Sequence, residues 1–152
     1  MISQSPKTGF LQFSQKVDYG LFLLIELARN GSGEPVSLRV IAERSRMSFS
    51  FLQKVAFELR KADLISADRG KNGGYILKKD PKTVTLKEII EALEGPIAVM
   101  SCFSHQEGQP QCVRLGNCCM RQGLGYINQT IVNLFCQTTL HHLLFPTWKQ
   151  PA

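Results

Sequence analysis

Several features that would place this chain in other classes of protein are missing from its sequence. No long apolar run lies next to a cleavage site, and the longest apolar block, Leu21–Ile25, is far too short to cross a bilayer. No two cysteines have the CxxC spacing of a zinc knuckle or a thioredoxin-like site. We therefore expect a soluble, cytoplasmic protein with no membrane partner and with neither of these two kinds of cysteine site.

Motifs of enzyme chemistry are also missing. The glycine-rich stretch 70–74 lacks the GKS or GKT ending of a phosphate-binding loop, and no helix is predicted directly after it. No recognisable motif places a general base beside a cysteine, as a thiol enzyme would need. These absences predict that the protein is not an enzyme.

The composition allows one domain of ordinary size, or a small domain with a helical extension. The chain has 152 residues, 43% of them apolar, which is enough for a real core. Its formal net charge of +6 is compatible with a nucleic-acid partner, although charge alone is weak evidence.

Helices are predicted over 15–30, 38–45, 49–62 and 85–95, where apolar residues recur at helical spacing. Ser14, Ser37 and Ser48 are candidate N-caps, and Thr85 with Glu88 has the pattern of a capping box. The second and third helices are joined by the tight connection 46–47, which matches a helix-turn-helix. The alternative is an ordinary helical hairpin with solvated charges.

A small β-hairpin is predicted directly behind the third helix. Strand-like runs at 64–67 and 75–78 flank the glycine-rich, cationic stretch 68–74. Together these elements predict a winged helix in which Arg69 enters a narrow minor groove. The expected fold class is mainly α with a small β wing, organised as a winged helix-turn-helix domain (1–96), a cysteine-rich loop (97–120) and a C-terminal dimerisation helix with its tail (121–152).

Four of the five cysteines lie within the stretch 102–119, which is rich in Gly, Gln, Pro and Asn. Nine residues separate Cys102 from Cys112, five separate Cys112 from Cys118, and Cys119 follows directly. Cytosolic thiols are kept reduced, so we expect metal binding or redox sensing and not a disulfide framework. Thiolates spread over a pliable segment suit an iron–sulfur cluster. Zinc, a redox disulfide and inert thiols remain open at this point.

The segment 121–137 has an apolar stripe along one helical face: Leu124, Ile127, Ile131, Leu134 and Phe135. A lone amphipathic helix needs a partner surface. We expect it to pack against its equivalent in a second chain, since winged-helix regulators commonly bind palindromic DNA as two-fold dimers. The alternative is that it folds back on its own domain. Cys136, on this helix, is expected to be a small buried hydrophobe.

These residues resemble a bacterial family of iron–sulfur regulators typified by IscR and NsrR. The matching stretches are KVDYGL, VSLRVIAERSRMSFSFLQKVAFELRKADLI, RGKNGGYIL, TLKEIIEALEGPIAVMSC and TLHHLL, which together cover most of the chain. The resemblance implies a dimeric transcription factor that binds a palindromic site in double-stranded promoter DNA. It also implies a [2Fe-2S] or [4Fe-4S] cluster that alters promoter binding.

By the same resemblance, the cluster ligands are Cys102, Cys112 and Cys118, while Cys119 is a spare cysteine. Two departures stand out: the gap before Cys112 is longer than the family's usual five residues, and Arg121 stands where the IscR branch has a histidine ligand.

Similarity to the NsrR branch points to Asp18 of the partner chain as the fourth ligand, with His105 as an alternative. The simpler alternative is that Asp18 is a solvent-exposed carboxylate in the first turn of the first helix, where the helix dipole favours a negative charge.

The resemblance also implies two groups of DNA-contacting residues. Ser48, Ser50, Phe51, Gln53 and Lys54 would face the major groove, and Arg69 and Lys71 would contact the minor groove and phosphates. Phe51 could equally belong to the core. The expected function is regulation of transcription in response to iron–sulfur status, redox state or nitric oxide; the alternative is a winged-helix regulator that uses bare thiols or zinc.

Overall fold

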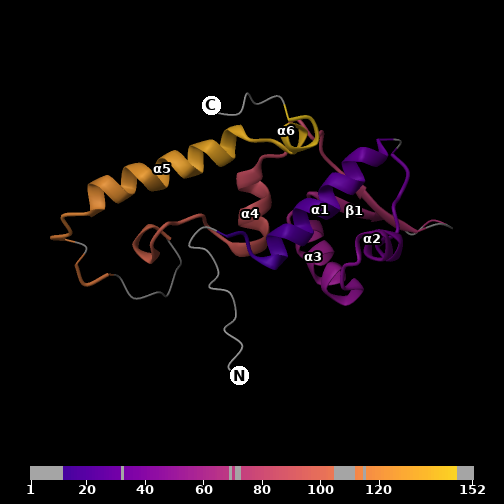
Figure 1. The fold of residues 1–152 in the computed structure, drawn as a ribbon, viewed down its shortest axis with the longest axis horizontal. Helices are drawn as coiled ribbons and strands as arrows, with labels where there is room; N and C mark the ends of the chain where they lie inside the picture. The colour runs from indigo at the N-terminus through magenta and orange to yellow at the C-terminus, as the bar shows by residue number, and fades with distance from the viewer. Residues whose placement is uncertain are drawn as a thin grey trace, which may run out of the picture.

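The computed structural model describes residues 12–31, 33–68, 70, 73–104, 112–114 and 116–146. Its elements follow one another along the chain as α1 (Gln15–Asn30), α2 (Leu38–Ser45), α3 (Phe49–Lys61), β1 (Ile65–Asp68), β2 (Gly74–Leu77), α4 (Leu86–Glu94), the short 3-10 helix η1 (Ser101–Phe103), α5 (Arg121–Gln137) and α6 (Leu140–Leu144). Figure 1 shows a compact group of helices from which α5 extends to one side. The mainly helical fold class with a small two-stranded wing is confirmed.

Local capping explains where the helices begin and end. The Ser14 side chain accepts the Val17 N–H at the start of α1, and Gly31 ends that helix in the left-handed conformation at φ 48°. The Thr85 side chain accepts the Glu88 N–H at the start of α4. Only this half of the predicted capping box is formed between Thr85 and Glu88. The Glu88 carboxylate accepts a hydrogen bond from Lys79.

The helix-turn-helix consists of α2 and α3. Arg46 lies in the left-handed region at φ 54°, and the Met47 N–H donates to the Ala42 carbonyl at 2.9 Å, which turns the chain sharply between the two helices. The Ser48 side chain then caps α3 by accepting the Phe51 N–H.

The wing is an antiparallel pair in which Ile65 lies opposite Leu77 and Asp68 lies opposite Gly74. Both strands lie within one residue of their predicted positions. An isolated bridge between Val36 and Tyr75 joins the wing to the segment before α2. A Cβ at Gly74 would lie 2.6 Å from the Val36 carbonyl oxygen, so this close approach requires glycine.

The core lies between α1, α3 and α4, and its fully buried side chains include Leu23, Leu24, Leu52, Leu59 and Ile89. Leu140 of α6 is also fully buried there, and Thr139 bridges to Thr85 at the start of α4. The last described helix therefore returns to the domain that the first ninety or so residues build.

The long helix α5 differs from the other long helices because none of its residues is buried. It contacts α4, and Phe135 near its end packs against the core. Ile127 and Leu134 of its apolar stripe are 49% and 54% exposed. No helix in the described part of the chain is long and apolar enough to span a membrane.

Candidate functional site

The first candidate site is the exposed side of α3. Ser48, Ser50, Gln53 and Lys54 are exposed, as expected for side chains that contact DNA, whereas Phe51 is half-buried against the core. Lys54 has no acidic partner among the residues that the structure describes, so its charge is free to meet a phosphate.

The first turn of α3 is held by a residue that the sequence reasoning did not single out. The Ser48 N–H donates to the Tyr19 hydroxyl at 3.1 Å, and the Tyr19 ring meets Phe51 edge-on with 4.9 Å between centroids. Tyr19 stands in the KVDYGL stretch that carries the family resemblance. That stretch was the available signal in the sequence. It could not show the contact, because Tyr19 and Ser48 are 29 residues apart in the chain.

The base of the wing is rich in ion pairs. The hydrogen bond from Lys78 lowers the pKa of the Asp63 carboxyl, and the hydrogen bond to Glu88 raises the pKa of Lys79. Both lysines are thus ion-paired within the chain at exposed positions, where such pairs contribute little free energy. The predicted DNA contacts Arg69 and Lys71 lie outside the described residues.

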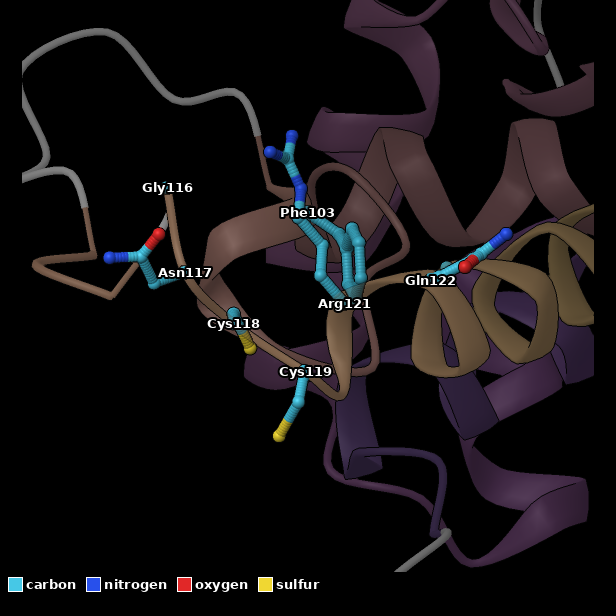
Figure 2. Close-up of a pocket in the computed structure, with 8 residues that line it drawn as sticks. Phe103, Gly116, Asn117, Cys118, Cys119, Arg121 and Gln122 are labelled. Atoms are coloured by element: carbon cyan, nitrogen blue, oxygen red, sulfur yellow. The ribbon is translucent and has the colours of Figure 1, made fainter.

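The second candidate site is the cysteine segment that runs from the end of α4 to the start of α5. Cys102 is half-buried within η1, and the Val99 N–H, just before it, donates to the Asn128 side chain of α5 at 2.9 Å. Cys118 is half-buried and Cys119 is exposed, and both border an open hollow of about 600 Å³ together with Phe103 and Arg121. Figure 2 shows the two thiols side by side just before α5.

The described cysteines are all free thiols. In the described ranges of this single chain, no three His, Cys, Asp or Glu side chains lie close enough together to hold a metal ion. The structure therefore does not bring Cys102, Cys112 and Cys118 together, and Cys112 is exposed on its own short described stretch. The alternative ligand His105 lies outside the described residues.

Asp18 is exposed in the first turn of α1. Its carboxylate makes no ion pair with any residue that the structure describes. The expectation for Cys136 is not met in this single chain: its thiol is exposed on α5, a helix with no buried residue.

A helix-turn-helix followed by a two-stranded wing defines a winged-helix DNA-binding protein. The family model of Rrf2, described as an iron-dependent transcriptional regulator, matches residues 13–146. The chain belongs to the Rrf2 family. It is therefore a transcriptional regulator and not an enzyme, and regulators of this family bind DNA as dimers.

Individual relatives come from several branches of the family. The chain is 28% identical over 134 residues to the HTH-type transcriptional regulator NsrR of Bacillus licheniformis, which covers 88% of this chain and 92% of NsrR. Among solved structures, CymR, the global cysteine regulator of B. subtilis, superposes with a TM-score of 0.74 at 31% identity, covering 91% of this chain and 99% of CymR. The T. potens IscR structure gives a TM-score of 0.69 at 28% identity, covering 93% of each chain. The predicted resemblance to IscR and NsrR is confirmed.

Proposed function

We propose that this regulator senses iron–sulfur status, redox state or nitric oxide through a [2Fe-2S] or [4Fe-4S] cluster. Its ligands are Cys102, Cys112 and Cys118 of one chain and Asp18 of a second copy. The observation that carries the proposal is the position of the cysteine segment: it lies outside the core, is tied to α5 through Asn128, and presents free thiols beside an open hollow.

The donor set fits an iron–sulfur cluster in its chemistry. Thiolates are the usual ligands of such clusters, and three of them come from one segment here. When bound, the cluster supplies a group that reacts with oxidants or nitric oxide and is lost or changed in doing so. A carboxylate is a harder ligand than a thiolate, so an Asp18 ligand would leave one iron easier to attack.

Two exposed features favour completion of the site by a second chain. Asp18 is exposed without an ion pair in the described structure, and the apolar stripe of α5 is half-open to solvent. Pairing of α5 with its equivalent would cover that stripe and bring a second copy of the first helix near the cysteine segment. Cys102, Cys112 and Cys118, which one chain does not bring together, could then meet at the surface of the second chain.

Each part of the chain has its own role in DNA binding. Residues 1–96 read the promoter, residues 97–120 hold the cluster, and residues 121–152 form the dimer. The α3 side chains, with Arg69 and Lys71, contact a palindromic site whose half-sites lie roughly 34 Å apart on one face of the duplex. The cluster sets the geometry of the loop relative to α5, and through the α5 pair it sets the separation of the two α3 helices. A small change in that separation breaks the contacts between one α3 and the DNA of its half-site. A regulator of this kind works in the cytoplasm, where the promoter is.

A second candidate is a regulator that uses bare thiols or zinc. Two observations favour it: the described residues of one chain do not gather three ligands, and the fold superposes well on a global cysteine regulator. In this version Cys118 and its neighbours report thiol chemistry directly, without inorganic sulfide.

Anaerobic purification with metal analysis separates the two candidates. A coloured protein with iron and acid-labile sulfide supports the cluster, whereas a colourless protein with stoichiometric zinc, or with no metal, supports the second candidate. The cluster proposal also requires that loss of iron change the footprint on a promoter duplex. Uptake of iron and sulfide without any change in DNA binding would contradict the sensor function.

A further inference from the structure

Tyr19 joins the first turns of α1 to the start of α3. Tyr19 as a whole is 9% exposed and belongs to the core, and its hydroxyl accepts a hydrogen bond from the Ser48 N–H at 3.1 Å. Its ring also contacts Phe51, three residues further along, in an edge-on pair. One side chain of α1 thus touches α3 at two points within its first turn.

These two contacts act where the DNA-contacting side chains originate. Ser48 is the N-cap of α3, and its own side chain accepts the Phe51 N–H and lies 3.2 Å from the Ser50 hydroxyl. Its backbone N–H has no place in the hydrogen-bond ladder of α3, because the ladder begins after the cap. The Tyr19 hydroxyl satisfies that donor.

We infer that Tyr19 is a positioning residue for DNA reading: its hydroxyl fixes the Ser48 cap, and its ring fixes Phe51. Ser50, Gln53 and Lys54 then project from a turn whose position and direction are set by α1. Removing the hydroxyl leaves the aromatic ring in the core but frees the cap to shift. A shift well below one helical turn is enough to misplace hydrogen bonds to base edges, which require close heavy-atom distances.

The same stretch of α1 is fastened to the end of α4, which leads into the cysteine segment. The Lys16 ammonium donates to the Leu93 carbonyl, and the Ser14 hydroxyl donates to the Glu94 carboxylate at 2.5 Å. Asp18 directly precedes Tyr19 in the chain. This part of the inference rests on the proposed function. If Asp18 binds a cluster, a change at that ligand moves Tyr19, and Tyr19 holds Ser48.

The positioning role is tested on cluster-free, full-length protein by Tyr19→Phe. The probe is a palindromic duplex selected from a randomised library by the wild-type protein, and a scrambled duplex of equal length measures non-specific binding. Loss of one hydrogen bond predicts about a two- to tenfold weaker affinity for the selected duplex, with unchanged binding to the scrambled one. Thr83→Val, which removes an exposed hydroxyl that donates to the Asp80 carbonyl outside α3 and α5, is the control and should leave both affinities unchanged.

Two results would overturn this role. One is a Tyr19→Phe protein that binds the selected duplex within twofold of wild type. The other is an equal loss of affinity for both duplexes together with a lower melting temperature, which would indicate a purely structural effect. A loss confined to the selected duplex, at unchanged salt dependence, supports positioning because phosphate contacts alone would not discriminate between the sequences.

The link to Asp18 is tested with the same two duplexes. Affinity for the selected duplex is compared between anaerobically reconstituted and chelator-treated protein, for wild type and for Tyr19→Phe. We expect the ratio between the two states to move toward one in the variant, and an unchanged ratio would refute transmission through Tyr19. If wild type itself shows no difference between the states, the proposed sensor fails, while the cluster-free result still decides the positioning role.

Discussion

Cys118 and Cys119 are adjacent in the chain and border the same hollow, but the family resemblance implies a ligand role for Cys118 only. We predict that Cys118→Ser abolishes retention of iron and sulfide after anaerobic reconstitution, since a serine hydroxyl is a poor substitute for a thiolate. Cys119→Ser should retain both, which makes it a control matched in position and chemistry. Iron analysis and the visible absorption spectrum measure the outcome, and equal loss in the two variants would show that the ligand assignment is wrong.

Asp18 gives a second prediction for a single residue. Asp18→Ala should change the spectrum of the reconstituted protein and shorten the lifetime of its cluster in air, because one ligand is lost. The control is Glu34→Ala, which removes an exposed carboxylate beyond the other end of α1. A spectrum and lifetime equal to those of wild type would exclude Asp18 and direct attention to other ligands, His105 among them.

Single residues also show where sequence reasoning ends. The exposure of Ser50, Gln53 and Lys54 agrees with their expected role, because the helical period alone places them away from Leu52 and Val55. The role of Tyr19 could not be predicted in this way. A tyrosine on an apolar helical face is predicted to be a core residue. Only the packed structure shows that its hydroxyl accepts a hydrogen bond from a backbone N–H at the start of another helix.

The packing of α1 against α4 depends on Gly20. A Cβ at this position would lie 2.4 Å from the Leu93 Cδ1, and Leu93 is buried. We predict that Gly20→Val lowers the free energy of unfolding by about 1–3 kcal/mol, because the inserted methyl groups overpack the contact between the helices. Denaturant unfolding followed by circular dichroism measures the loss.

A double-mutant cycle tests the cause of that loss. Leu93→Ala alone should cost about 2–5 kcal/mol by opening a cavity. Combined with Gly20→Val, it should cost clearly less than the sum of the two single changes, since the new side chain fills the space. Strict additivity would show that Gly20 is needed for some reason other than its contact with Leu93.

At the scale of elements, the sequence predicts α1, α2 and α5 almost to the residue. Ser14 and the Asn30–Gly31 step bound α1 through local hydrogen bonds and backbone conformation, which neighbouring residues decide. The strands are displaced by one residue from their predicted positions, because their pairing depends on the partner strand and on the close approach of Gly74 to Val36.

At the scale of the whole molecule, the proposed dimer depends on the exposed apolar stripe of α5. We predict that Ile127→Glu converts the protein to a monomer and abolishes binding to a palindromic duplex, because an unpaired charge would be buried between two copies of the helix. Gln129→Glu adds the same carboxylate to an exposed position of the same helix and should leave the dimer intact. Light scattering coupled to size exclusion measures the mass, and a dimeric Ile127→Glu protein would place the interface elsewhere.

The sequence alone determined the helices and the wing behind the third helix, because caps, helical periods and glycine-rich turns act between residues close in the chain. The family was predicted separately, from the stretches that match it. Only the tertiary structure decided that Leu140 returns to the core, that Cys136 is exposed and that Tyr19 holds Ser48. The physical reason is distance along the chain. Each of these outcomes depends on which faces of distant helices pack together, and burial is a property of that packing and not of any one segment.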